Sequence, residues 1–263
     1  MTTTIKEVQP KEYFDVIDLW KTQVNFNLPD EVNPLFSNPA ILVFLNNVPF
    51  ASYIFDIGSQ EFRFVSDNII GYFGHHAGTF SRGELELKNK VVHPVDLPNI
   101  WKFFKIYWQH VNLIPSIERA KYKFNFDYRI VKPGGEEARI LEQVIIFQQD
   151  LIGNITHILG TCTDITGWKK SGEQLTTLSS TIDDKVILLK PEGDKSINSQ
   201  VFLSRREIEI VKLLSQGNSS KCIADKLHIS FNTVNTHRQH IIKKTNTKNT
   251  GELVQFAAGV GMI

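Results

Sequence analysis

Two helix starts with the same pattern occur in the C-terminal part of the sequence, and they constrain the fold more than any other feature. Ser204 is followed three residues later by Glu207, a pair that predicts a capping box at the start of a helix. Ser230 is placed in the same way before a second helix. A shorter helix is predicted over 221–227, and a tight segment joins it to Ser230. Proteins that place a helix in the major groove of DNA have this order of helix, turn and second helix.

The second of these helices, predicted over 231–245, has an apolar face and a polar face. Val234 and Ile241 are seven residues apart, two turns on one face, and are expected to point into a small core. The opposite face has no large apolar residue and carries Asn232, Asn235, Thr236, Gln239 and Lys243. Amides and hydroxyls match the hydrogen-bonding groups of base edges, so this face is a candidate for base contact.

The charges of the chain are distributed unevenly. From Val201 to the C-terminus there are 9 Lys and Arg against 4 Asp and Glu, a net of +5, so the remainder carries −4 and the whole chain +1. No acidic residue occurs between Lys226 and Gly251. Such a basic window is expected where a protein docks on phosphates, although a solvated surface has the same composition.

This region resembles the C-terminal DNA-binding domain of LuxR-type transcription regulators, from Leu203 to about Ala258. The matching elements are Leu203-Ser204-x-Arg206-Glu207, Leu213-Leu214-x-x-Gly217, Ile223-Ala224-x-x-Leu227-x-Ile229-Ser230, Thr233-Val234-x-Thr236-His237 and Ile241-x-x-Lys244. The resemblance implies that Asn235, Thr236 and Gln239 reach bases. It also implies that phosphates lie near Thr233, Arg238, Lys243 and Lys221, the last at the positive start of its helix. With Asn232, these residues form the predicted DNA-binding set.

The chain departs from the family at two positions. Asn235 stands where the family often has lysine, and an amide can pair with adenine through two hydrogen bonds. Cys222 stands where glutamate is common, which removes a capping-box partner for Ser219 and leaves a small residue expected to be buried or half-buried. A last helix is predicted over 252–259. In the family this helix often supplies a dimer contact, although core packing alone requires the same apolar residues.

Alternating apolar residues, turns and one aromatic-rich helix define the larger, N-terminal region. Strands are predicted over 51–56 and 61–66 as a hairpin, then a helical stretch, a helix over 99–111, and strands over 122–130, 138–147 and 154–164. In the first of these three strands every second residue from Tyr122 to Ile130 is apolar, which predicts that one face is buried.

This order resembles a PAS domain over about residues 40–168. The specific matches are His93-Pro94-x-Asp96, Tyr128-Arg129-Ile130 followed by Gly135, and Asp164-Ile165-Thr166. The resemblance implies that a small-molecule ligand can be held between sheet and helices, but the cofactor stays unknown. A flavin photoreceptor needs a reactive cysteine on a helix, whereas Cys162 lies on the last predicted strand. His93, His110 and His157 are haem candidates, but a lone histidine is more often structural.

The sequence indicates no enzyme and no metal site. It contains no Gly-rich phosphate loop, HExxH motif or nucleophile elbow, and isolated carboxylates such as Glu118 and Glu142 are expected to be surface charges. Cys162 and Cys222 have no metal-ligand spacing, which favours a reduced, cytoplasmic compartment. No apolar run is long enough to cross a membrane, and no signal sequence is expected at the N-terminus.

Two further helices are predicted outside the strands. Trp168, Leu175 and Ile182 recur every seven residues, with Leu178 between them, which predicts either a short coiled coil or a helix packed on its own sheet. An extended segment over 185–190 and a hinge over 191–195 follow. Near the N-terminus a second amphipathic helix is expected to cover the sheet or join a dimer interface; its apolar residues are Phe14, Ile17, Trp20 and Val24.

The expected fold is α+β: an N-terminal PAS-like antiparallel sheet with flanking helices, a linker helix, and a C-terminal all-α helix-turn-helix domain. The expected divisions are an N-terminal helical extension (1–37), a sensor domain (38–168), a linker (169–200) and the DNA-binding domain (201–263). We expect a cytoplasmic, homodimeric one-component transcription regulator that binds double-stranded DNA. The alternatives are a protein-interaction adaptor, or a cofactor-bearing sensor, whose helix-turn-helix serves mainly in dimerisation.

Overall fold

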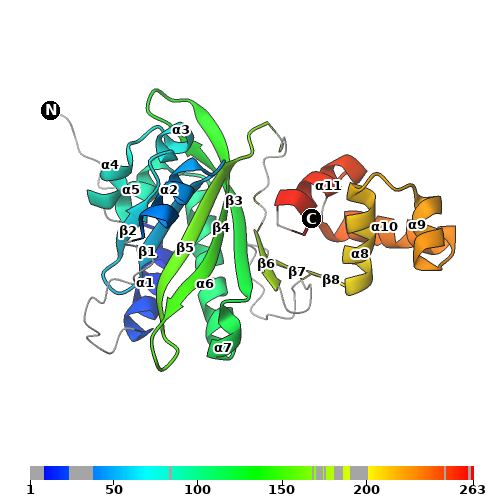
Figure 1. Ribbon diagram of the computed structural model, residues 1–263, viewed down its shortest axis with the longest axis horizontal. Helices are drawn as coiled ribbons and strands as arrows, with labels where there is room; N and C mark the ends of the chain where they lie inside the picture. The colour runs from blue at the N-terminus through cyan, green and yellow to red at the C-terminus, as the bar shows by residue number, and fades with distance from the viewer. Residues whose placement is uncertain are drawn as a thin grey trace.

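The computed structural model contains an N-terminal unit built on a sheet and a C-terminal unit of helices (Figure 1). It describes residues 9–23, 38–82, 85–167, 169, 174, 176–180, 186–189, 201–245, 247–259 and 262–263. Among these residues, no helix combines the length and the apolar character needed to cross a bilayer.

The N-terminal unit has the predicted order of two strands, a helical stretch and three strands. Its strands are β1 (Ala51–Asp56), β2 (Glu61–Val65), β3 (Tyr122–Val131), β4 (Glu137–Gln149) and β5 (Ile155–Asp164). They pair antiparallel in the order β2-β1-β5-β4-β3. The predicted PAS-like arrangement of the sheet is therefore confirmed.

Helices flank this sheet, and several of them supply part of its core. They are α1 (Lys11–Gln23), α2 (Pro39–Asn47), α3 (Ile69–Phe73), α4 (Ala77–Arg82), α5 (Leu85–Val91), α6 (Leu97–Leu113) and α7 (Ser116–Arg119). The aromatic-rich helix α6 packs on β3, where Phe104 contacts the rings of Phe124 and Phe126. On α1, Trp20 contacts Trp108 of α6, so α1 belongs to the same core. Phe14, predicted on the apolar side of α1, is instead 54% exposed.

The predicted half-burial of β3 is wrong. The residues from Phe124 to Tyr128 are all buried, including Asn125 and Asp127 between the aromatic residues. Asn125 donates to Thr177 Oγ1 at 3.1 Å, and Asp127 accepts from Arg139 and from Lys169 Nζ. Burial on both faces of β3 is possible because the polar side chains of Asn125 and Asp127 each have hydrogen-bond partners.

The predicted linker helix is also wrong where the structure describes it. Three strands, β6 (Thr176–Ser180), β7 (Val186–Leu189) and β8 (Val201–Leu203), extend the sheet from β3 in the order β3-β6-β7-β8. Leu178 lies on β6 opposite Phe124 and is 1% exposed. β3 offers an edge of unpaired backbone groups, and the β6 sequence of threonines and serines is a poor helix former. β7 confirms the predicted extended segment, while Trp168, Leu175, Ile182 and the hinge over 191–195 lie outside the described residues.

The described residues of the C-terminal unit form four helices after β8: α8 (Arg205–Ser215), α9 (Ser220–Leu227), α10 (Phe231–Thr245) and α11 (Thr250–Gly259). Val234 and Ile241 of α10 are fully buried in its core, as predicted. Leu253, Phe256 and Ala257 of α11 fill the same core. These three side chains therefore pack within their own subunit. Val260, the fourth residue of the predicted apolar face, lies outside the described residues.

Candidate DNA-binding surface

The start of α8 has the predicted capping box and is linked to α10. The Ser204 backbone N–H donates to Glu207 Oε2 at 2.7 Å, and the Glu207 N–H donates to Ser204 Oγ at 3.3 Å. Lys244 Nζ of α10 lies 2.8 Å from the same Glu207 oxygen, whose side chain is only 4% exposed. Burial acts to raise the pKa of Glu207, but the bonds from Lys244 and Ser204 outweigh it and leave this pKa lowered.

Glu207→Gln is expected to lower the free energy of unfolding at neutral pH by about 1 kcal/mol, because it removes the ion pair but keeps the cap. A carboxylate with a lowered folded pKa stabilises above its unfolded pKa and loses this contribution as the pH falls through the folded value. The difference between wild type and variant, measured by urea unfolding from pH 7 to pH 3, should therefore shrink toward acid. A constant difference would show that Glu207 stabilises without its charge.

The turn between α9 and α10 is fixed by backbone and side-chain hydrogen bonds. His228 ends α9 in the left-handed conformation, with φ of 52°, and the Ile229 N–H donates to the carbonyl of Ala224 at 3.1 Å. Arg206 of α8 donates to the carbonyl of Leu227 at 2.7 Å. Ser230 then caps α10 by accepting from a backbone N–H in the first turn. The angle between the two helices is therefore set by bonds from three segments.

The polar face of α10 is open to solvent. Asn232, Thr236, Gln239 and Lys243 are exposed, and Asn235 is half-buried. Thr236 Oγ1 donates to the carbonyl of Asn232 at 3.0 Å, which leaves its lone pairs available. Within the part of the chain that the structure describes, the amides of Asn235 and Gln239 form no side-chain hydrogen bonds. These two amides are four residues apart and are available for base edges.

The predicted phosphate contacts divide into two groups. Lys221, in the first turn of α9, and Lys243 are exposed. Arg238 is part-buried, with Nη1 donating to Ser220 Oγ and Nη2 donating to Thr250 Oγ1 at 2.6 Å, so it joins α9 and α11 to α10. The Thr233 hydroxyl lies 2.8 Å from Ser230 Oγ. The side chains of Arg238 and Thr233 therefore also form hydrogen bonds within the C-terminal unit. The sequence pattern did not indicate these bonds.

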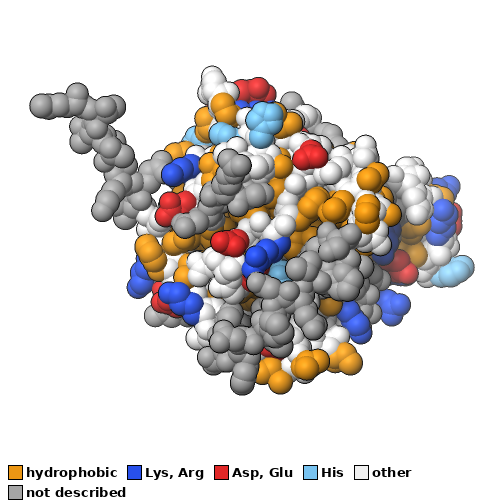
Figure 2. All heavy atoms as spheres, turned by 60° about the vertical axis from the view of Figure 1, so that its left-hand side comes forward, with side chains coloured by type: hydrophobic (Ala, Val, Ile, Leu, Met, Phe, Trp, Pro, Cys, Tyr) orange, Lys and Arg blue, Asp and Glu red, His pale blue; other side chains and the backbone are white. Residues whose placement is uncertain are grey.

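The start of α9 is capped by Ser219 although Cys222 stands at the position where the family commonly has glutamate. Ser219 Oγ accepts from the Cys222 N–H at 3.3 Å, and Cys222 Sγ lies 3.3 Å from Asn218 Oδ1. Lys226 Nζ donates to the same Asn218 oxygen at 2.9 Å. Cys222 is half-buried, as expected. Figure 2 shows Lys, Arg and His side chains exposed at its right-hand edge, where the C-terminal helices lie.

A family model described as GerE, bacterial regulatory proteins of the LuxR family, matches residues 201–257. These residues form a LuxR-family helix-turn-helix domain. The oxygen regulatory protein NreC of Staphylococcus carnosus is 47% identical over 56 residues, 21% of this chain and 26% of that protein. NreC of Staphylococcus haemolyticus is 37% identical over 81 residues, 30% of this chain and 37% of that protein. The chain thus spans well under half the length of these curated relatives.

Two solved structures also match. The Vibrio cholerae VqmA dimer in the absence of target DNA is 15% identical, with a TM-score of 0.33, and the match covers 86% of this chain and 88% of that one. A PAS domain of a protein from Colwellia psychrerythraea is 14% identical, with a TM-score of 0.34, and the match covers 47% of this chain and 92% of that one.

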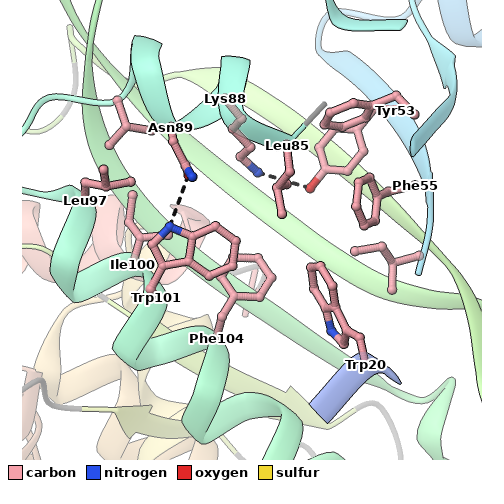
Figure 3. A pocket seen from close by; sticks show the side chains of 13 residues that line it. Trp20, Tyr53, Phe55, Leu85, Lys88, Asn89, Leu97, Ile100, Trp101 and Phe104 are labelled. Carbon is pink, nitrogen blue, oxygen red and sulfur yellow. Dashed lines mark hydrogen bonds between the residues drawn. The ribbon is translucent and has the colours of Figure 1, made fainter. Parts of the chain in front are cut away.

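The N-terminal unit, joined to the LuxR-family domain by β6 to β8, contains a small cavity of about 20 Å³ (Figure 3). A cavity of this size holds about one water molecule. The polar lining comes from Tyr53 of β1 and from Lys88 and Asn89 of α5, and Asn89 accepts from Trp101 Nε1 at 3.1 Å. The other lining residues are Trp20, Phe55, Phe62, Leu85, Val92, Leu97, Ile100, Trp101, Phe104 and Ile158.

The expectation that Glu142 is a surface charge is wrong. Its side chain is fully buried beside the cavity, where its carboxylate accepts from Tyr53, from Lys88 and, at 2.5 Å, from Tyr128. Burial, and next the nearby Glu142 charge, raise the pKa of both phenols well above the ordinary value. Glu142 alternates with Ile140 and Val144 along β4, so the three side chains share its inward face. This alternation is the signal in the sequence that could have placed Glu142 in the core.

Gly160 allows Tyr53 to reach this carboxylate. The two residues are opposite each other in the β1–β5 pairing, and a Cβ at position 160 would lie 2.1 Å from the Tyr53 ring. Only glycine leaves room for the ring here. The sequence pattern gave no indication of this role.

Neither the histidines considered as haem ligands nor Cys162 line the cavity. The lining of the cavity does not include His93, His110 or His157. His93 Nδ1 accepts from the Val95 N–H at 3.2 Å, and burial lowers the pKa of His110. Burial, and then Glu142, raise the pKa of the Cys162 thiol well above its ordinary value, which disfavours the reactive thiolate.

Proposed function

We propose that this protein is a transcription regulator that binds specific sequences of double-stranded DNA and acts in the cytoplasm. The observation that carries the proposal is the exposed face of α10, where the amides of Asn235 and Gln239 form no bonds within the described chain. Lys243 lies exposed on the same helix, and Lys221 lies exposed in the first turn of α9. Amides suit base edges and exposed ammonium groups suit phosphates, so the face combines both kinds of contact.

The rigid support of α10 favours base contact over a general role in dimerisation. Lys244 joins α10 to the start of α8, and Arg238 joins it to α9 and α11. Groups that read bases must be held in a defined position, and these bonds hold α10 against the other three helices of the C-terminal unit. An adaptor that used this domain only for dimerisation would not need cations around an open polar face.

Salt-dependent DNA binding tests this proposal. Lys221→Ala and Lys243→Ala are each expected to weaken binding to all sequences alike and to lower the slope of log affinity against log salt by about one. Lys21→Ala on α1, which is exposed and distant in sequence, is the matched control and should leave the slope unchanged. If either variant changed the preferred sequence but kept the slope, its assignment to phosphate would be wrong.

We further propose that the N-terminal unit senses a small molecule and controls the LuxR-family domain. The cavity of about 20 Å³ is much smaller than the roughly 300 Å³ of a ligand site, so a ligand must displace lining side chains. Coupling is supported by β7: Val186 lies in the C-terminal core, whereas Ile187 and Leu189 lie in the N-terminal core. Mass spectrometry can identify a small molecule that copurifies with the protein, and DNA-binding assays with and without this molecule then test the proposal. A bound molecule that leaves the DNA affinity unchanged would contradict control of the LuxR-family domain by the N-terminal unit.

A homodimer on DNA is proposed because one recognition helix spans few base pairs. Two-fold related helices reading half-sites about one helical turn apart extend the recognised sequence. The apolar side of α11 is used in its own core, so other surfaces would form the contact. Sedimentation of the protein with a two-half-site duplex measures the stoichiometry, and one copy per duplex at saturation would contradict the proposal.

A further inference from the structure

Phe231 is an exposed aromatic residue at the edge of the polar face of α10. It is the first residue of the helix and is 51% exposed. Within the described residues of the C-terminal unit, only Ile263 is another large apolar side chain with such exposure. The surrounding residues Asn232 and Thr233 are polar and exposed. Single exposed apolar residues are common on protein surfaces, and what distinguishes Phe231 is its place beside the candidate base-reading residues.

The position of Phe231 on the helix connects it to the candidate base-reading residues. Phe231, Asn235 and Gln239 follow each other at intervals of four residues, so they form one stripe along α10. The N-terminal residues of a recognition helix are those that contact base edges. Side chains at the start of a helix also lean toward its N-terminus, which carries the ring beyond the first turn.

Resting on the proposed DNA binding, we propose that Phe231 reads a thymine by packing against its 5-methyl group in the major groove. The methyl group is the apolar feature that distinguishes thymine from the other bases, and phenylalanine is among the side chains that contact it. An amide that pairs with adenine selects A·T pairs, whose partner base presents a methyl group in the same groove. Phe231 and Asn235 thus recognise neighbouring A·T pairs by two different kinds of contact.

Replacing thymine by deoxyuridine removes only the methyl group and tests this inference. Duplexes carrying the sequence that the wild-type protein selects are made with deoxyuridine at each thymine position in turn. The wild-type protein is expected to bind about fourfold more weakly when the contacted methyl is absent, the factor that corresponds to burying one methyl group. Phe231→Ala should bind the thymine and deoxyuridine duplexes equally, and Phe231→Leu should retain part of the discrimination.

The other possible results distinguish failure of the Phe231 inference from failure of the proposed DNA binding. If Phe231→Ala weakens binding to both duplexes but keeps the wild-type discrimination, another residue reads the methyl and the inference is overturned. A wild-type protein that binds the selected DNA but ignores every methyl overturns it as well, and leaves the proposed function standing. A wild-type protein that selects no DNA overturns the proposed function and this inference together. Thermal unfolding shows that each variant is folded, as expected for a change at an exposed side chain.

Discussion

Lys88→Met is expected to lower the free energy of unfolding of the N-terminal unit by about 3–5 kcal/mol, because it leaves a buried carboxylate without its cation. The Glu142 side chain is 0% exposed and that of Lys88 12% exposed, so water does not replace the lost partner. The Lys88 ammonium also lies over the ring of Tyr53, 5.0 Å from its centroid. Urea unfolding followed by tryptophan fluorescence measures the loss in this unit, since residues 201–263 contain no tryptophan.

A matched control separates burial from charge. Lys105→Met removes the cation from an ion pair with Asp15 at 2.7 Å, in which both side chains are partly exposed, and a much smaller loss is expected. Replacing both partners, as Lys88→Met with Glu142→Leu, should recover part of the stability because no buried charge remains. Equal losses for Lys88→Met and Lys105→Met would contradict the assignment of Glu142 as a buried, paired carboxylate.

Gln239→Ala is expected to cost about 1–3 kcal/mol of binding free energy at one A·T pair and to relax the preference there. The exposed amide can donate to adenine N7 and accept from its N6 group, a combination that only adenine offers in the major groove. Because no charge is removed, the salt dependence should stay unchanged.

Selection of sites from a random DNA pool measures this effect. The position under Gln239 should lose its adenine preference in the variant, while the other positions keep theirs. Gln255→Ala, an exposed amide on α11, is the control and should select the wild-type sequence. A Gln239→Ala protein that recovers the wild-type preference at every position would exclude direct readout by Gln239.

Local chemistry explains why the C-terminal unit could be predicted from the sequence. The capping box of Ser204 and Glu207 involves residues three apart, and the apolar period of α10 repeats within two turns. Short-range patterns of this kind specify helix starts and buried faces directly. The order of strands along the N-terminal unit could be predicted in the same way, from alternating apolar residues and from the turn residues between them.

The features that sequence reasoning missed depend on contacts between distant residues. Glu142 is buried because Lys88 and Tyr53, 54 and 89 residues away in sequence, lie against it. Leu178 matched a short heptad pattern, but pairing of β6 with the edge of β3 determined its structure. The hydrogen bonds of Arg238 to Ser220 and Thr250 join three different helices, so no local pattern in the sequence indicated them. Tertiary pairing of this kind overrides local preference and leaves little trace in one sequence.

Selection by the wild-type protein tests the central claim most directly. The full chain, held near physiological salt, is passed over a random duplex pool, and the enriched sequences are compared with the starting pool. We predict enrichment of a motif with A·T pairs at the positions under Asn235 and Gln239, bound at least a thousandfold more tightly than unrelated DNA. A pool that stays random, or binding that is equal for all sequences, would contradict the claim that α10 reads DNA.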